Sequence, residues 1–209
     1  MATPVRPSRR PAGRFTTVRP ASTTPPPDAV LPAPHPNAPK PGTKLGSHYS
    51  KCFGCGDDAV GGLRVQSTVG EGLSVTTEFT VTENHQGAPG LAHGGLLALA
   101  FDEALGAVNW LLGAVAVTGR LETDYLRPVP VGTTLHIEAH CDGVSGRKIY
   151  HSAVGRLGGS DGDVAVRATA IFISVGVDHF LENGRLEDVQ EAMHDPEQIR
   201  AARAFEVNP

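Results

Sequence analysis

The chain has 209 residues, a formal net charge of −4 and a hydrophobic content of 40%, which suit one folded domain with tails. This charge gives no overall attraction to nucleic acid or to an anionic membrane, so we expect neither as a partner. Three cysteines, no signal-peptide pattern and no apolar run judged long enough to span a bilayer predict a cytoplasmic protein.

The N-terminal segment is rich in proline, with twelve of the seventeen prolines between Pro4 and Pro41. Because this composition offers no packed apolar face, residues 1–46 are predicted to be a disordered tail. The first twenty residues also contain five arginines and no acidic residue, a composition found in organelle transit peptides (Arg6, Arg9, Arg10, Arg14 and Arg19). The prolines disfavour the amphipathic helix that such a peptide needs.

Alternating apolar and polar residues predict strands in the rest of the chain. The runs 63–66 and 73–76 flank the turn Gly70–Gly72 and are typical of a hairpin. Four further strand-like runs are separated by turns rich in glycine and proline, and their spacing predicts an antiparallel meander (115–126, 133–141, 147–157 and 164–175).

A glycine-rich loop, 84–95, leads into a long apolar segment that ends at Gly113 and that only Asp102, Glu103 and Asn109 interrupt. Such a segment predicts a buried helix. One buried helix early in a series of strands indicates an α+β fold, in which a curved antiparallel sheet wraps round one long central helix, the hotdog arrangement. We assign this domain to residues 47–177 and a helical extension to 178–209.

Five motifs then identify a family resemblance: Cys52–Gly56, Asn84–Gly87, His93–Gly95, Asp102 and Arg127–Pro128. Residues 50–175 resemble the PaaI-type hotdog acyl-CoA thioesterases, particularly the type of thioesterase superfamily members 4 and 5. In that family an aspartate follows the histidine of a His-Gly-Gly motif by nine residues, and a threonine follows the aspartate by sixteen. Asp102 and Thr118 occupy these positions here.

The resemblance implies hydrolysis of acyl-CoA to a free acid and CoA, without a cofactor. Gly94 and Gly95 begin the helix, where unpaired N–H groups and the helix dipole stabilise negative charge, so the Gly95 N–H is the expected oxyanion donor. His93 would orient this loop or form a hydrogen bond near the carbonyl.

Asp102 is the expected catalytic carboxylate, as general base or as nucleophile. The resemblance implies that Thr118 reaches it from the other subunit of a homo-oligomer, a dimer or tetramer. Burial should raise the pKa of Asp102, and the hydroxyl of Thr118 should lower it. Glu103 is the rival acid, although it points about 100° away round the helix. The family carries smaller polar residues at Arg120 and Glu122, and by simple alternation these share a solvated strand face with Thr118.

Further residues are candidates for binding the substrate acyl-CoA. The loop residues are expected to shape the site (Asn84, His85 and Gly87). In the resembled family, basic side chains at the positions of Arg147 and Lys148 can reach the CoA phosphates, and Arg127 could serve in the same way. Each of the three also fits an ordinary solvated surface charge. The helix leucines, Phe101 and Trp110 suit a medium or long aliphatic acyl chain.

Cys52 and Cys55 form a Cys-x-x-Cys motif, which is typical of half of a zinc site, and His48 is the candidate third ligand. No second pair of ligands follows at a finger-like spacing, so we expect no metal, and a redox pair lacks its βαβ context. Cys141 is expected to be a core residue.

Two other functions remain open from the sequence. One is a hotdog enoyl-thioester hydratase, although the histidine motif of such enzymes is not found. The other is a hotdog module that binds acyl-CoA without turnover.

Overall fold

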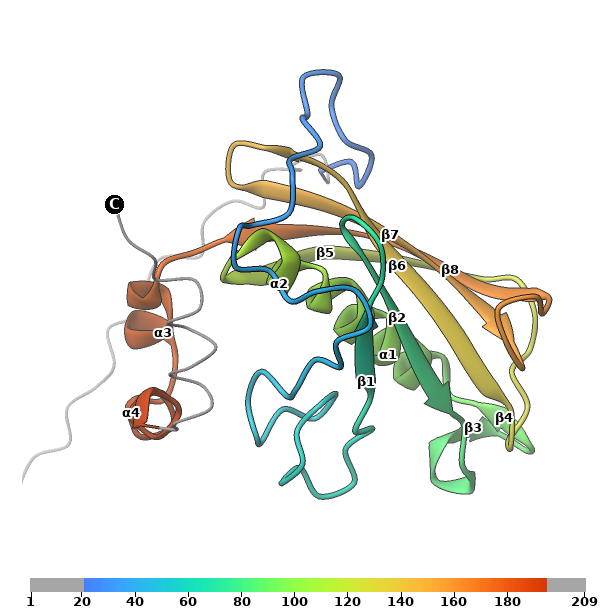
Figure 1. Cartoon of the computed structure of the whole chain (residues 1–209). Coiled ribbons are helices and arrows are strands. Elements are labelled where there is room, and N and C mark those ends of the chain that lie inside the picture. The colour runs from blue at the N-terminus through green and yellow to red at the C-terminus, as the bar shows by residue number, and fades with distance from the viewer. Residues whose placement is uncertain (1–20, 195–209) are drawn as a thin grey trace, which may run out of the picture.

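The structure, a computed structural model, describes residues 21–194. A curved six-stranded antiparallel sheet arches over one long helix (Figure 1). The strands of this sheet are β1 (Gln66–Val69), β2 (Ser74–Thr80), β5 (Ala116–Tyr125), β6 (Thr134–Ser145), β7 (Lys148–Leu157) and β8 (Val164–Ser174). The α+β class and the hotdog arrangement are therefore confirmed.

The strands lie in the order β1-β2-β6-β7-β8-β5. The predicted meander is correct for β6, β7 and β8, but β5 does not lie beside β6. The chain runs along the sheet as a helix before it enters β5, so this strand is added at the far edge, beside β8. A short helical turn η1 (Glu83–His85) and a two-stranded ribbon, β3 (Gln86–Ala88) and β4 (Leu91–Ala92), connect β2 to the helix.

The core lies between the sheet and the helices α1 (Gly94–Ala107) and α2 (Asn109–Leu112). Phe101 and Leu105 are fully buried there. The 19-residue stretch Gly94–Leu112 is in fact long and apolar enough to cross a membrane, so the prediction that no such run exists is wrong. Its apolar side chains pack against the concave face of the sheet, which explains why a core helix has this composition.

Residues 21–46 contact the sheet, so the prediction of a disordered tail is wrong for this part. Thr23 is buried: its hydroxyl donates to Glu122 Oε2 (2.6 Å) and accepts from Thr169 Oγ1 (2.9 Å). Val30 and Val144 exchange backbone hydrogen bonds, and Leu45 is buried in the core. Extended chain needs no internal hydrogen bonds, so it tolerates many prolines when a few residues anchor it. The five arginines lie outside the described residues.

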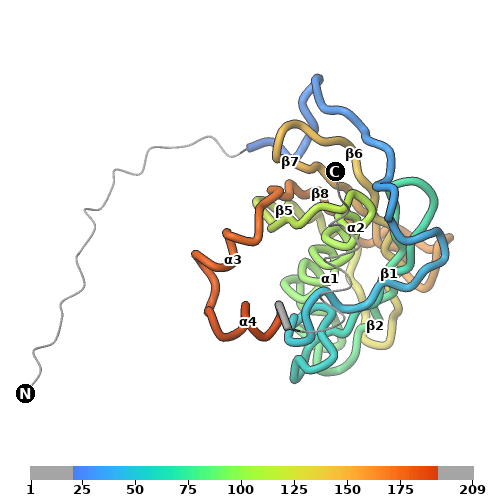
Figure 2. The backbone as a smooth tube through the Cα atoms, turned by 60° about the vertical axis from the view of Figure 1, so that its left-hand side comes forward, coloured from blue at the N-terminus to red at the C-terminus, as the bar shows by residue number. Residues whose placement is uncertain are grey.

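Two helices follow the sheet, α3 (Val177–Asn183) and α4 (Leu186–His194), in the segment expected to be a helical extension. Figures 1 and 2 show them beside the sheet rather than across it. Lys51 links α4 to the loop that precedes β1, because its Nζ lies 2.5 Å from Glu191 Oε2. Residues 195–209 lie outside the described part of the chain.

A buried polar pair, Asn109 and His151, joins α2 to β7. His151 is fully buried, and its Nε2 lies 2.9 Å from Asn109 Oδ1. Among the described residues its Nδ1 has no hydrogen-bond partner. Burial lowers the pKa of His151 to about 4, because the charged imidazolium would lose its hydration.

This pair predicts acid sensitivity. The unfolded chain binds a proton at His151 below about pH 6.5, whereas the folded chain does not until about pH 4. The free energy of unfolding is therefore at its full value above pH 6.5 and decreases as the pH falls below it. Between pH 6.5 and 5, the free energy of unfolding measured in urea should decrease by up to about 2 kcal/mol more in wild type than in His151→Gln. The glutamine keeps a hydrogen-bond donor for Asn109 but does not titrate. Equal pH dependence in the two proteins would contradict this reading.

Candidate active site

The start of α1 is capped by its own histidine. His93 is the N-cap residue, and its Nδ1 accepts a hydrogen bond from the Gly95 N–H (2.9 Å). The expected oxyanion donor is therefore already paired in this conformation. Because Nδ1 accepts, it carries no proton, and the His93 ring must rotate away before the Gly95 N–H can bind a carbonyl oxygen.

Tyr125 holds the same helix start from β5. Its hydroxyl donates to the Gly94 carbonyl oxygen (2.7 Å), and burial raises the pKa of this phenol. Tyr125 is not among the site residues expected from the sequence. The only available signal was a hydroxyl-bearing aromatic residue at the end of a strand, just before the Arg127–Pro128 motif.

The loop motif Asn84–Gly87 supports the cap through backbone contacts. The His93 N–H donates to the His85 carbonyl oxygen (2.7 Å). A Cβ on Gly87 would lie 2.7 Å from the His93 Cα, so a glycine is required where the two segments approach. The structure thus gives His85 and Gly87 a structural role at the site, while the side chain of Asn84 is exposed at the loop surface.

The structure brings Asp102 and Thr118 together. The Thr118 hydroxyl donates to Asp102 Oδ1 (2.9 Å) within one chain, so the expectation that the threonine comes from another subunit is wrong. Burial raises the pKa of Asp102, and the hydrogen bond from Thr118 lowers it, the balance expected from the sequence. This arrangement holds a half-buried carboxylate that is poised to accept a proton.

A β-bulge in β5 explains the orientation of Thr118. The pairing with β8 shifts between Thr118 and Arg120, which leaves Gly119 as the extra residue. The bulge interrupts the strict alternation, so the predicted common face of Thr118, Arg120 and Glu122 is wrong. Thr118 reaches α1, whereas Glu122 pairs with Arg120 and contacts Thr23 of the N-terminal segment. The two larger charges therefore do not line the Asp102 site in this chain.

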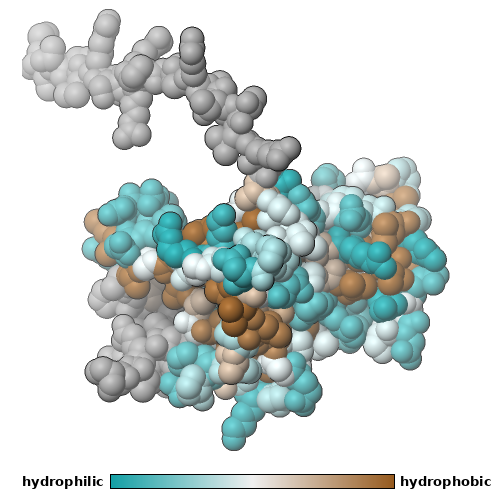
Figure 3. Space-filling view, turned by 90° about the horizontal axis from the view of Figure 1, so that it is seen from above, coloured by the Kyte–Doolittle hydropathy of each residue, from teal (hydrophilic) through white to brown (hydrophobic). Residues whose placement is uncertain are grey.

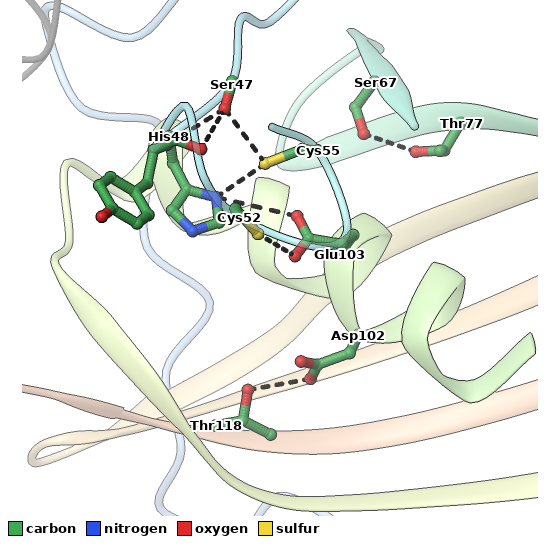
Figure 4. A network of polar contacts seen from close by, with 10 residues as sticks. Ser47, His48, Cys52, Cys55, Ser67, Thr77, Asp102, Glu103 and Thr118 are labelled. Atoms are coloured by element: carbon green, nitrogen blue, oxygen red, sulfur yellow. Dashed lines mark hydrogen bonds and ion pairs between the residues drawn. The ribbon is translucent and has the colours of Figure 1, made fainter. Parts of the chain in front are cut away.

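Glu103 belongs to a different cluster from Asp102 (Figure 4). Its carboxylate lies 3.1 Å from Cys52 Sγ and 3.8 Å from His48 Nδ1, and Cys55 Sγ lies 3.1 Å from the same imidazole nitrogen. Burial, followed by the contact with Cys52, raises the pKa of Glu103 to about 7. Three members of this cluster were expected from the sequence, whereas the fourth, Glu103, comes from the central helix and was not expected there.

The basic candidates do not form one cluster. Arg127 follows β5 and lies beside the start of β8, where its Nε is 3.4 Å from Asp163 Oδ2. Arg147 lies at the other end of β8, where its carbonyl oxygen accepts from the Ser174 N–H, and the exposed Lys148 is next to it. Nine residues of strand separate the two ends by about 30 Å. One CoA phosphate group therefore cannot contact all three side chains of one chain.

An apolar cavity of about 540 Å³ lies between residues 32–36 and the adjoining ends of α2, β6, β7 and β8. Asp102 is not among its lining residues. Phe101 was expected to line an acyl pocket, but it is fully buried against Gly155 of the sheet, so this expectation is wrong. Within one chain, Asp102 lies on a partly exposed helix face rather than in this cavity.

The comparisons with known proteins agree with this geometry. Residues 89–170 match the family model described as the thioesterase superfamily. The acyl-coenzyme A thioesterase THEM4 of Xenopus laevis is 33% identical over 90 residues, which cover 43% of this chain and 40% of that protein. The chain thus matches less than half the length of that curated relative.

Two solved structures share the fold. A thioesterase superfamily protein superposes with a TM-score of 0.54 at 32% identity and covers 58% of this chain and 62% of its own. The E. coli PaaI protein from the phenylacetic acid degradation operon gives 0.50 at 20% identity, over 55% of this chain and 81% of its own. Residues 89–170 are thus similar to the thioesterase superfamily, and the surrounding strands complete a hotdog fold.

Proposed function

We propose that this protein hydrolyses acyl-CoA thioesters to a free acid and CoA. The observation that carries the proposal is the Asp102–Thr118 hydrogen bond, which holds a half-buried carboxylate two turns from the start of α1. The name of the Xenopus laevis relative, an acyl-coenzyme A thioesterase, supports the same chemistry.

In the proposed reaction, ionised Asp102 removes a proton from water while the water oxygen bonds to the thioester carbonyl carbon. The Gly95 N–H, released by rotation of His93, donates to the resulting oxyanion. The oxyanion then collapses, the C–S bond breaks, and the CoA sulfur leaves with the proton. In the alternative first step the carboxylate attacks the carbonyl carbon, the C–S bond breaks and the CoA thiolate leaves. Water then hydrolyses the mixed anhydride, which restores the carboxylate and releases the free acid, and the thiolate takes up the proton.

The distance along α1 favours a site built from two chains. Gly95 and Asp102 are seven residues apart, which is about 10 Å along the helix axis. Asp102 therefore cannot attack a carbonyl that the Gly95 N–H of its own chain holds. A second copy would place its own Gly95 near this Asp102, so we propose a homo-oligomer in which paired chains complete each site.

The exposed surface supports this pairing. Apolar side chains are exposed at both ends of the edge strand β5, at Val115, Tyr125 and Leu126. Apolar patches are also visible among polar residues on the face shown in Figure 3. Surfaces of this kind are typical of interfaces between chains.

For the acyl group, we propose a medium or long aliphatic chain, held by the partly exposed leucines of α1 and by Trp110 rather than by the buried Phe101. Arg147 and Lys148 are exposed at one end of the sheet and are the proposed contacts for CoA phosphates, while Arg127 already pairs with Asp163. A cytoplasmic location remains a prediction.

One observation favours a second candidate, an acyl-CoA-binding module without turnover. The N–H of Gly95 is occupied by His93, and a site locked in that state would lack its oxyanion donor. Turnover assays distinguish the two functions directly.

Substitution of Asp102 tests the catalytic role of this carboxylate. Asp102→Asn should reduce hydrolysis of a panel of acyl-CoAs by about 100- to 10,000-fold, because the amide cannot accept the proton from water. Asp161→Asn makes the same chemical change in an exposed turn and should retain wild-type activity. A thiol-detection assay for released CoA measures both.

Two outcomes would contradict the assignment. Full activity of Asp102→Asn with loss of activity in Glu103→Gln would transfer the catalytic role to the rival carboxylate. Saturable binding of acyl-CoA by wild type without any release of CoA would favour the binding module.

The pH dependence of the reaction tests the role of Thr118. The Thr118 hydroxyl stabilises the ionised form of Asp102, so Thr118→Val should raise the pKa of this carboxylate. Because the reaction needs the ionised form, the acid limb of the kcat/KM profile should move to higher pH in Thr118→Val and stay in place in Thr118→Ser. An acid limb that is the same in all three proteins would show that this hydrogen bond does not tune the reacting group.

A further inference from the structure

We propose that His48, Cys52, Cys55 and Glu103 bind one Zn²⁺ ion, which joins the loop before β1 to the central helix. The four ligand atoms, one imidazole nitrogen, two sulfurs and one carboxylate oxygen, all lie within 4.8 Å of one another. Figure 4 shows the four side chains converging from the loop and from α1.

The separations are close to those of a tetrahedral zinc site, and two of them are slightly shorter. Zinc bonds of about 2.0 to 2.3 Å place neighbouring ligand atoms about 3.3 to 3.8 Å apart. Here Cys55 Sγ lies 3.1 Å from His48 Nδ1, Cys52 Sγ lies 3.1 Å from Glu103 Oε1, and His48 Nδ1 lies 3.8 Å from Glu103 Oε2. Small side-chain movements are enough to admit the ion.

The backbone of the Cys-Phe-Gly-Cys-Gly turn is shaped for this convergence. A Cβ on Gly54 would lie 2.1 Å from Glu103 Cγ, so only glycine lets the turn approach the helix carboxylate. A Cβ on Gly56 would lie 2.2 Å from the Ser50 carbonyl oxygen, and the Gly56 N–H donates to the Cys52 carbonyl oxygen (2.7 Å). Both glycines therefore close the turn so that the two sulfurs face the same point.

The loop has no regular secondary structure of its own. Residues 46–65 contain no helix or strand, and two large apolar side chains in this stretch are exposed, Phe53 by 49% and Val60 by 95%. Backbone hydrogen bonds and the buried Val65 hold part of this segment. A metal ion would add a link between side chains of the loop and of α1.

The donor set selects the metal and its role. Two thiolates and an imidazole favour zinc over magnesium or calcium, which prefer oxygen ligands. Four protein ligands leave no open position for a substrate, as in structural zinc sites. The site is thus separate from Asp102. No metal was expected because the sequence has no second pair of ligands at a finger-like spacing, but in the fold His48 and the Glu103 carboxylate complete the set.

The test is the metal content of the full chain, purified with reductant and without chelator. We expect one zinc ion per chain by inductively coupled plasma mass spectrometry in wild type and in Cys141→Ala, a control at a cysteine outside the cluster. Cys55→Ala should lose the ion. Zinc retained in Cys55→Ala at the wild-type level would overturn the proposed ligand set.

Cobalt substitution gives a second readout that needs no variant to fold. Reduced apo wild type loaded with Co²⁺ should show the intense visible bands of tetrahedral coordination and a near-ultraviolet sulfur-to-cobalt band. Wild type that contains no zinc and gives no such spectrum would overturn the proposal. A disulfide between Cys52 and Cys55 in protein kept under reductant, detected by mass spectrometry, would overturn it as well.

Discussion

The hydrogen bond from Thr118 to Asp102 is the interaction on which the proposed chemistry depends. An ionised carboxylate on an apolar helix loses hydration, and burial alone raises its pKa. The hydroxyl from β5 offsets part of this cost and fixes the direction of the carboxylate. It can do so only because β5 runs beside β8 at the edge of the sheet and the bulge at Gly119 turns Thr118 toward the helix.

The two adjacent acidic residues of α1 take separate roles because successive helix positions point about 100° apart. Asp102 faces β5, whereas Glu103 faces the cysteine loop. The same helix therefore carries the proposed catalytic carboxylate and anchors the segment before β1. Its N-terminus is held from two other directions, by the His93 cap and by the Tyr125 hydroxyl. The helix thus carries Asp102, Glu103 and the Gly95 N–H, while β5 supplies Thr118 and Tyr125.

Periodicity predicted the buried helix and the strands, because alternation and apolar runs reflect which faces are covered. The resemblance to the PaaI-type thioesterases, through the spacing from His93 to Asp102 to Thr118, predicted the candidate pair that the fold brings together. The sequence did not predict the edge position of β5 or its bulge, because local composition does not specify how a strand pairs with its neighbours. The contacts of residues 21–46 and the approach of Glu103 to the cysteines were missed for another reason: they join residues far apart in the sequence, and only the folded chain brings them together.

The most direct test of the central claim is a crystal structure with an acyl-CoA analogue in which a methylene separates the carbonyl from the sulfur. The account predicts that the carbonyl oxygen accepts a hydrogen bond from the Gly95 N–H of one chain, with His93 rotated away. The carbonyl carbon should then lie beside Asp102 of the second chain, or beside a water bound to it. A carbonyl bound away from both groups, in an otherwise ordered complex, would contradict the account.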